Sequence, residues 1–274
     1  MIVKEVSGAI GAIIEDVQLN KNLHANTISD IYDVFLKYQV IFFRNQNLTP
    51  ESLIFFAKQI GKPISYPFVK GLDSFPEITP ILKKKTDINN FGGIWHSDTT
   101  YQKEPPKCTM LYAIEVPDSG GDTEFSNQYL AYESLSDEMK FFLDKKKAVN
   151  ISGKIEVTKT RSDVLKHSAL AIKNNKLEAI HPVVRMHPET KKKSLYINEA
   201  HTTHFIGMSE EESKPILKKL FIHQVNSKFT CRFKWEKGSV AIWDNRCTLH
   251  NPINDYHGSR RLMQRIIFQG DKPF

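Results

Sequence analysis

The chain of 274 residues carries 38 lysine and arginine residues against 31 acidic residues, so its formal net charge is +7 at neutral pH. With 40% hydrophobic and 11% aromatic residues, it can bury a large core, and a single domain spanning residues 1–274 is expected. No apolar run of about 18 residues is present in the sequence, so no membrane span is expected.

The amino-terminal part of the chain is predicted to alternate helices with a buried strand. Apolar residues recur at helical spacing over residues 28–35, and the run Val-Ile-Phe-Phe at 40–43 is typical of a buried strand. Thr49 supplies a capping hydroxyl and Pro50 a first-turn proline for a second helix, which is expected to end near Gly61. The apolar side chains of this second helix are expected in the core.

The middle and end of the chain are predicted to be richer in strands. One more helix is expected to begin at Ser136, and Ser209 with Glu212 forms the capping-box pattern of another. Strands are predicted from alternation or β-prone composition at 229–235, 239–245 and 260–268. The less patterned stretches 66–94 and 151–174 are expected to be loops or lids over a site.

The charged residues and cysteines exclude several classes of protein. Lysine triplets at 83–85, 145–147 and 191–193 fall in predicted loops or helix ends and lack interleaved aromatic residues, so they are interpreted as solvated surface. The three cysteines are odd in number and lack metal-type pair spacing. The first residues lack the basic-then-apolar pattern of a signal peptide. A cytoplasmic protein without nucleic-acid or membrane partners is therefore expected.

Two His-x-acid tripeptides, His96-x-Asp98 and His187-x-Glu189, are candidate pairs of metal ligands. About one such tripeptide is expected by chance in a chain of this composition, so context must distinguish them. The second tripeptide contains Pro188 and is interpreted as a polar turn. In an extended segment, side chains at i and i+2 project to the same face, so residues 96 and 98 could ligate one metal ion.

The surroundings of the first tripeptide support a ligand pair. A run with two glycines at 91–94 gives a flexible approach, and the sequence at 99–101 favours a continued strand or a strand end. His250 follows the predicted strand 239–245 and is the candidate third ligand. Two histidines and one carboxylate on one face of a ferrous ion leave other positions open for a chelating co-substrate and dioxygen.

Two arginines of the last predicted strand add an anion-binding element. Arg261 and Arg265 are separated by an even number of positions, so their side chains share one face of a strand. A guanidinium can hold a carboxylate through two parallel hydrogen bonds. The combined pattern predicts a non-haem iron site beside a carboxylate-binding arginine.

These motifs give the chain a close resemblance to the taurine dioxygenase/2,4-dichlorophenoxyacetate dioxygenase family of Fe(II)/2-oxoglutarate enzymes. The matching stretches follow the family's order over nearly the whole chain. They are Trp95–Asp98, Ser119–Thr123, His181–Arg185, Trp243–Arg246, His250 and Arg261–Phe274. The resemblance implies a mixed, β-rich fold with a double-stranded β-helix (jelly roll) core and flanking α-helices.

The resemblance also implies roles for individual residues. His96, Asp98 and His250 would hold Fe(II), and the presence of Asp98 disfavours the related halogenases, which have alanine or glycine at that position. Arg261 would pair with the distal carboxylate of 2-oxoglutarate, and Thr123 would hydrogen-bond the same group. The implied reaction consumes O2 and 2-oxoglutarate, releases succinate and carbon dioxide, and hydroxylates a C–H bond of the substrate.

The residues expected around the substrate differ from those of taurine-specific members. Arg265 lies where the family places an arginine near the substrate's acidic group. Tyr66 and Gly92 occupy the positions of a histidine and an asparagine that surround the sulfonate, and His201 replaces a phenylalanine. The expected substrate is a small anionic organic molecule, such as a sulfonate, an aryloxyalkanoate or another carboxylate, and taurine itself is not favoured. The resemblance also implies a homo-oligomer.

Other histidines and one cysteine are interpreted as structural. His201 and His204 have the spacing of a helical metal pair, but no acidic or thiol residue lies near them in the sequence. His181 is interpreted as structural, and Cys247, shortly before His250, as a packing residue.

Three functions are compatible with the sequence. The leading one is the hydroxylase of a small organic acid described above. A second is a biosynthetic oxidase that uses the same cycle on an amino-acid-derived acid. A third is a non-catalytic jelly roll that binds a metal or a ligand, which the complete ligand set and Arg261 disfavour.

Overall fold

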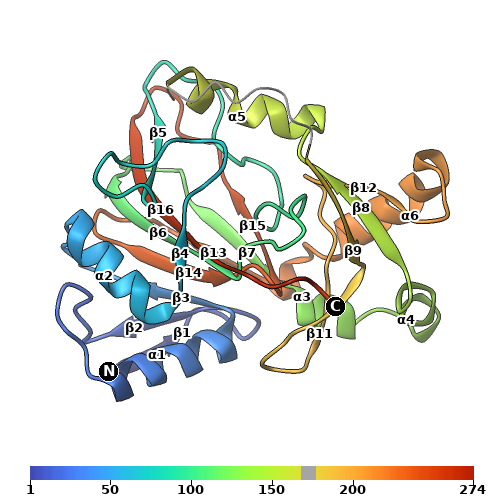
Figure 1. Ribbon diagram of the computed structural model, residues 1–274, viewed down its shortest axis with the longest axis horizontal. Coiled ribbons are helices and arrows are strands. Elements are labelled where there is room, and N and C mark those ends of the chain that lie inside the picture. The colour runs from blue at the N-terminus through green and yellow to red at the C-terminus, as the bar shows by residue number, and fades with distance from the viewer. Residues whose placement is uncertain (168–176) are drawn as a thin grey trace.

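The computed structural model describes residues 1–167 and 177–274. Strands form the centre of the molecule, and helices lie around them (Figure 1). This mixed, β-rich architecture agrees with the predicted fold class. Within the described part of the chain, no helix is long and apolar enough to cross a membrane.

The largest sheet forms one wall of the core. Its strands are β1 (Ile2–Glu5), β2 (Ala12–Glu15), β3 (Val40–Phe43), β4 (Pro63–Ile64), β5 (Thr79–Lys83), β6 (Cys108–Glu115), β14 (Val240–Asp244) and β16 (Arg261–Phe268). Their order is β1-β2-β3-β14-β6-β16-β4, with β5 also paired to β16. The strands predicted at 40–43, 239–245 and 260–268 are confirmed as β3, β14 and β16.

A smaller sheet packs against the largest sheet. It consists of β13 (Thr230–Phe233), β7 (Thr123–Asn127) and β15 (Thr248–Pro252), in that order. Phe42 of β3 stacks on Phe233 of β13 with ring centroids 3.9 Å apart, and Phe125 of β7 meets Phe42 edge-on at 5.6 Å. These rings belong to a buried apolar cluster shared by the two sheets. The cluster holds His250 of β15 close to the arginines of β16.

Two helices cover the other face of the largest sheet. They are α1 (Ala25–Tyr38) and α2 (Pro50–Ile60), which lie beside β1, β2 and β3 in Figure 1. Ile31 and Phe35 of α1 are buried against the sheet, as their spacing predicts. Thr49 caps α2 by accepting a hydrogen bond from the backbone N–H of Ser52, and the helix ends before Gly61. Both predicted helices are confirmed.

The remaining elements form a third region beside the two sheets. They are α3 (Gln128–Glu133), α4 (Asp137–Leu143), β8 (Lys147–Ile151), β9 (Glu178–Pro182), β10 (Val184–Met186), β11 (Lys193–Leu195), β12 (Thr202–Phe205), α6 (Glu210–His223) and a short 3-10 helix, Ser227–Phe229. Strands β12, β8 and β9 form one antiparallel sheet, and β10 pairs with β11. Ser136 caps α4, and Ser209 with Glu212 forms the predicted capping box of α6.

The stretch 66–94 is not only loop, because it contains β5. This strand pairs with β16 and alternates buried and half-buried residues. Lys83, which was predicted to be solvated with its triplet, is only 4% exposed, and its Nζ lies 4.3 Å from the centre of the Tyr256 ring. The prediction for Lys83 is wrong because the alternation of β5 directs this side chain inward.

The stretch 151–174 contains a helix instead of the predicted loop. Helix α5 (Ile155–His167) lies over the core at the top of Figure 1, and residues 168–174 lie outside the described residues. Its apolar periodicity is weak, which is why the sequence pattern does not identify it. Polar contacts hold it instead, since Asp163 Oδ2 accepts hydrogen bonds from Asn89 N at 2.9 Å and Asn89 Nδ2 at 3.2 Å.

Candidate metal centre

A backbone bridge between two distant segments brings His96 and His250 together. His96 N donates to His250 O at 3.0 Å, and His250 N donates to His96 O at 2.8 Å. The imidazole centroids are 4.1 Å apart, and Asp98 Oδ1 lies 3.7 Å from His96 Nε2. One potential ligand atom from each of the three residues lies within 4.8 Å of the others. The three predicted ligands thus form a buried group of the type that holds ferrous iron.

The backbone turns immediately after Asp98 instead of continuing as a strand. Residues 98–101 form a turn in which Thr99 has a φ of 46°. Ser97 points away from the candidate ligands and donates its Oγ hydrogen to Asn245 O at 2.7 Å. The alternation expected for residues 96 to 98 is therefore present, and of the two outcomes expected at 99–101, a continued strand or a strand end, the structure shows the end. The turn instead directs Tyr101 into a neighbouring cavity.

Two hydrogen bonds orient the candidate ligands. His96 Nδ1 lies 2.7 Å from Ile94 O, and because a carbonyl oxygen only accepts, Nδ1 carries the hydrogen and Nε2 keeps its lone pair. Thr109 Oγ1 donates to Asp98 Oδ2 at 2.5 Å, which fixes the carboxylate plane. Asn245 Nδ2 donates to the same Thr109 oxygen at 2.9 Å. These contacts hold the donor atoms in place without a metal ion.

Burial and neighbouring charges set the protonation states of the three residues. Burial lowers the pKa values of His96 and His250, which favours neutral imidazoles. Burial raises the pKa of Asp98, but the nearby charge of Arg265 and the hydrogen bond from Thr109 contribute to lowering it more, so its net pKa is below the usual value of 3.8. Neutral imidazoles and an ionised carboxylate are the forms that bind a metal ion.

Arg265 lies beside the candidate ligands. Its Nη2 is 2.7 Å from Asp98 Oδ1, an ion pair that lacks hydrogen-bond alignment. Its guanidinium also lies over the Tyr66 ring, with Cζ 4.7 Å from the ring centre. The side chain predicted to contact the substrate therefore reaches the immediate vicinity of the candidate metal ligands.

Arg261 lies four residues before Arg265, on the same face of β16. It is only 4% exposed, and its Nε and Nη2 have no hydrogen-bond partner among the described residues. Arg261 and Thr123 line a cavity of about 440 Å³ that also touches His96 and His250. Trp235 Nε1 donates to Thr123 Oγ1 at 2.9 Å, which leaves the threonine hydroxyl hydrogen available. A buried guanidinium without an anion fits a site for the carboxylate of 2-oxoglutarate.

A second cavity of about 320 Å³ adjoins the same candidate ligands. Tyr66, His201 and Arg265, the three residues predicted to contact the substrate, all line it. His96 and Asp98 line it as well, so the candidate metal centre borders both cavities. Arg261 lines the cavity of about 440 Å³, whereas Arg265 lines both cavities.

Gly92 makes close contact with a candidate ligand. Its φ is +74°, and a Cβ atom at this position would lie 2.9 Å from His96 Cε1. A larger residue would therefore strain the backbone and push the imidazole out of place.

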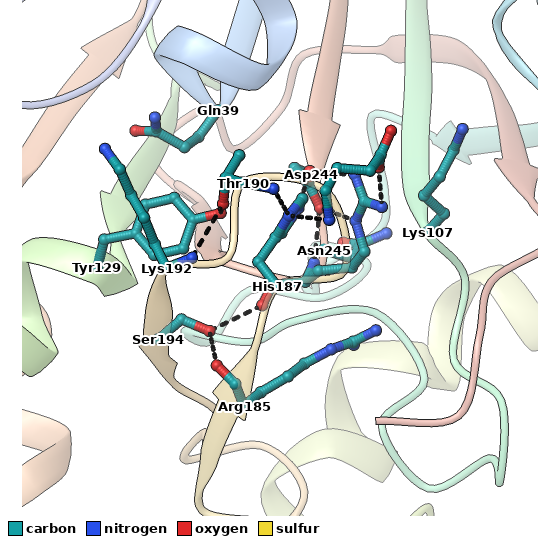
Figure 2. A network of polar contacts seen from close by, with 12 residues as sticks. Gln39, Lys107, Tyr129, Arg185, His187, Thr190, Lys192, Ser194, Asp244 and Asn245 are labelled. Atoms are coloured by element: carbon teal, nitrogen blue, oxygen red, sulfur yellow. Dashed lines mark hydrogen bonds and ion pairs between the residues drawn. The ribbon is translucent and has the colours of Figure 1, made fainter. Parts of the chain in front are cut away.

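A second group of potential ligands, His187, Asp244 and Cys247, also has atoms within 4.8 Å of one another. Figure 2 shows two of these residues, His187 and Asp244, next to each other. Asp244 accepts hydrogen bonds from Arg246 Nε and Nη2 at 2.8 and 2.7 Å and lies 3.1 Å from His187 Nε2. The His187 Nδ1 atom accepts from the backbone N–H groups of residues 189 and 190. Protein donors already occupy these lone pairs, so this group is structural and anchors the end of β14.

Loss of the Asp244 charge is expected to destabilise the protein. Asp244→Asn should lower the free energy of unfolding by about 3 kcal/mol, because Arg246 would lose its fully buried counter-ion and keep only the more exposed Glu189. Burial raises the pKa of Asp244, but Arg246 lowers it more, to well below 3.8. The stabilisation is therefore fully present above about pH 5 and decreases as the pH falls below about 4. Urea unfolding of the wild-type protein and Asp244→Asn between pH 8 and pH 3 measures this stabilisation. If the difference in the free energy of unfolding between the two proteins is the same at pH 3 as at pH 8, the assignment is contradicted.

The remaining histidines of interest make local contacts. His181 Nε2 lies 2.9 Å from Gln102 O, which supports its interpretation as structural. His201 Nδ1 lies 3.2 Å from Ile151 O, and His204 Nδ1 lies 2.9 Å from Thr203 Oγ1. His204 is on strand β12, so the helical metal pair considered for His201 and His204 does not form.

Four residues of the site have no function predicted from the sequence. Thr109 and Asn245 orient Asp98, and Tyr101 and Arg161 line the cavity of about 320 Å³. Asn245 belongs to a motif that the sequence analysis singled out, although no role was inferred for it. No local pattern marks Arg161, because the weak periodicity of α5 hides the helix.

Comparison with known proteins identifies the family. A sequence model described as "Taurine catabolism dioxygenase TauD, TfdA family" matches residues 3–267. The chain belongs to the TauD/TfdA family. It is similar to an alkylsulfatase of Acinetobacter baylyi, with 32% identity over 277 residues that cover 98% of this chain and 84% of the relative. It is also 32% identical over 280 residues to an alpha-ketoglutarate-dependent sulfate ester dioxygenase of Pseudomonas putida, covering 99% and 90% of the two chains.

Solved structures of TauD/TfdA proteins have the same fold. A taurine dioxygenase from Burkholderia xenovorans matches with a TM-score of 0.83 at 33% identity, covering 99% of this chain and 90% of that chain. AAD-2 in complex with Mn(II) and N-oxalylglycine matches with a TM-score of 0.86 at 23% identity, covering 99% and 98%, and supports the fold alone. Family membership confirms the predicted enzyme class, an Fe(II)- and 2-oxoglutarate-dependent dioxygenase.

Proposed function

We propose that this dioxygenase hydroxylates a small anionic organic substrate at an iron ion held by His96, Asp98 and His250. The observation that supports this proposal most directly is the buried convergence of these side chains, with potential ligand atoms within 4.8 Å of one another. Arg261 in the adjoining cavity, whose Nε and Nη2 have no hydrogen-bond partner among the described residues, supports it further. A bound iron ion supplies the redox chemistry of dioxygen activation and C–H hydroxylation, with succinate and carbon dioxide as products of 2-oxoglutarate.

Arg261 and Thr123 position 2-oxoglutarate in this proposal. The guanidinium forms a charge-assisted pair with the distal carboxylate, and the Thr123 hydroxyl donates its free hydrogen to the same group. Because Arg261 is buried, binding of the carboxylate neutralises a charge that water does not reach. Thr123 is fixed by its contact with Trp235, so the two groups are oriented before the co-substrate binds.

Arg265, Tyr66 and His201 bind the primary substrate in the other cavity. Once a metal ion neutralises Asp98, Arg265 is free to pair with the substrate's anionic group. Tyr66 and His201 pack around the substrate and exclude water from the reacting C–H bond.

The substrate class is a sulfate ester, sulfonate, aryloxyalkanoate or other small acid. Relatives include a sulfate ester dioxygenase, a sulfonate dioxygenase of Saccharomyces cerevisiae and a 2,4-dichlorophenoxyacetate dioxygenase of Cupriavidus pinatubonensis. Taurine is not the expected substrate, because Tyr66 and Gly92 replace the residues that surround the sulfonate in taurine-specific members. Hydroxylation next to a heteroatom would cleave such molecules.

The fold is proposed to be a double-stranded β-helix formed by the largest sheet and the sheet β13-β7-β15. The shared apolar cluster between the two sheets supports this assignment. Residues 1–274 are proposed to be one dioxygenase domain, which acts as a homo-oligomer in the cytoplasm.

Succinate release tests the proposed function. With Fe(II), O2 and 2-oxoglutarate, the protein is expected to release succinate at a rate stimulated by a matching small acid, and His96→Ala should reduce this rate by at least about a thousandfold. The exposed His257→Ala variant is the matched control and should keep the rate. Stimulated succinate release by His96→Ala at the normal rate would refute the proposal. A screen of sulfate esters, sulfonates and aryloxyalkanoates by this assay identifies the substrate.

A further inference from the structure

Two guanidiniums line the cavity that contains the proposed substrate residues. Arg265 extends from β16, and Arg161 extends from α5, which lies over the core (Figure 1). Arg265 Cζ lies 4.7 Å from the centre of the Tyr66 ring, and Arg161 Cζ lies 5.5 Å from the centre of the Tyr101 ring. Both aromatic rings line the same cavity of about 320 Å³ as the candidate ligand His96. The cavity therefore contains two cationic groups.

The position of Arg161 in α5 is fixed by its own contact and by contacts of the two residues that follow it. Asn89 Nδ2 donates to Ser162 Oγ and to Asp163 Oδ2, each at 3.2 Å, which ties the helix to the loop before Gly92. Arg161 Nη1 donates to Ser152 O at 3.4 Å. Within residues 1–167 and 177–274, no carboxylate forms an ion pair with Arg161. Its charge therefore lacks a counter-ion at the cavity wall.

Tyr101 supplies a further donor in this cavity. The side chain is 1% exposed, and its hydroxyl has no hydrogen-bond partner among the described residues. Burial raises the pKa of this hydroxyl, so it keeps its hydrogen at neutral pH. A buried hydroxyl without a partner is costly unless a ligand accepts its hydrogen bond. Tyr101 thus marks a place for an acceptor group of the substrate.

The balance of charge indicates how many negative charges the substrate brings. If iron binds as proposed, the charges of Fe(II), Asp98, doubly charged 2-oxoglutarate and Arg261 cancel. The charges of Arg161 and Arg265 then remain at the wall of the cavity of about 320 Å³. A cavity lined by two uncompensated cations favours a ligand with two negative charges.

We infer that the primary substrate is a dianion, and that Arg161 acts with Arg265 to select it over monoanionic acids. This inference rests on the proposed function, because it assigns Asp98 to the metal ion. The Tyr101 hydroxyl donates a hydrogen bond to the same substrate. The dianion is either one doubly charged head group, as in a phosphate monoester or phosphonate, or an acid with two separate anionic groups, as in a sulfocarboxylate. A simple alkyl sulfate engages only one of the two arginines.

Calorimetric binding tests the inference without turnover. The probes are hexyl phosphate, 6-sulfohexanoate and hexyl sulfate, added anaerobically at pH 8 to protein loaded with Fe(II) and 2-oxoglutarate. At this pH the phosphate monoester is doubly charged, because its second pKa is about 6. At least one dianion is expected to bind about tenfold or more tightly than hexyl sulfate. Arg161→Gln should reduce this ratio to about one, and Arg161→Lys should restore part of it.

The matched control is Lys159→Gln, which removes the same charge from an exposed position of α5 and should leave the ratio unchanged. If hexyl phosphate alone binds more tightly than hexyl sulfate, the substrate has a single doubly charged head group. If 6-sulfohexanoate alone binds more tightly, the substrate has two separate anionic groups. The inference is overturned if neither dianion binds more tightly than hexyl sulfate, or if Arg161→Gln keeps the wild-type ratio. Failure of the proposed function is distinguishable, because the protein would then release no succinate with any acid and would bind iron independently of His96.

Discussion

Asp98→Asn is expected to remove iron binding and to reduce succinate release by at least about a thousandfold. Asp98 is the anionic member of the candidate ligand group, and the amide lacks both the charge and the second acceptor oxygen. In the metal-free protein, the same change leaves Arg265 buried without its partner, so the free energy of unfolding should fall by about 3 kcal/mol. Equilibrium dialysis with Fe(II), succinate quantification and urea unfolding measure the three effects.

The exposed Asp118→Asn variant is the control for this prediction. It makes the same chemical change at a surface position, so iron affinity, turnover and stability should all match the wild-type protein. Wild-type iron affinity in Asp98→Asn would show that the metal ion binds elsewhere. Unchanged stability would show that Arg265 finds another partner.

Arg261→Met is expected to weaken 2-oxoglutarate binding while it stabilises the ligand-free protein. Affinity should fall by about a hundredfold, because a buried charge-assisted pair with the distal carboxylate is lost. The free energy of unfolding without ligand should rise by about 1 kcal/mol, since a buried guanidinium whose Nε and Nη2 lack partners gives way to an apolar side chain. The opposite signs of the two effects distinguish a binding residue from a structural one.

Anaerobic calorimetry with Fe(II) and 2-oxoglutarate measures the affinity, and urea unfolding measures the stability. Arg260→Met is the control, because this neighbouring arginine is half-exposed and pairs with Glu115. It should leave the affinity for 2-oxoglutarate unchanged. Normal affinity in Arg261→Met would remove the residue from the co-substrate site, and a loss of stability would show that its guanidinium is already satisfied.

Much of the local structure follows from short-range sequence patterns. Thr49, Ser136 and Ser209 begin helices because each hydroxyl accepts a hydrogen bond from the backbone N–H three residues later. Arg261 and Arg265 share a face of β16 because side chains alternate along a strand. The same rule places His96 and Asp98 together and directs Ser97 away from them.

Weak patterns explain where the sequence analysis fails. Helix α5 carries few apolar residues and depends on contacts with Asn89, which no helical periodicity reveals. The side chain of Lys83 points inward because β5 pairs with β16. The neighbouring lysines in the sequence instead suggest that this side chain is exposed to solvent. Thr99 adopts a left-handed turn that ends the segment after Asp98, although its β-branched side chain favours a strand.

The sequence by itself determined the enzyme family, the identities of the candidate ligands and most helix and strand positions. These features depend on residue type and on spacing within a few positions of the chain. The tertiary structure alone decided that His250 pairs with His96, that Nε and Nη2 of Arg261 are buried without a partner among the described residues, and that Arg161 of α5 reaches a cavity beside His96. Those relations join segments far apart in the chain, and they depend on sheet pairing and burial, which local spacing does not encode.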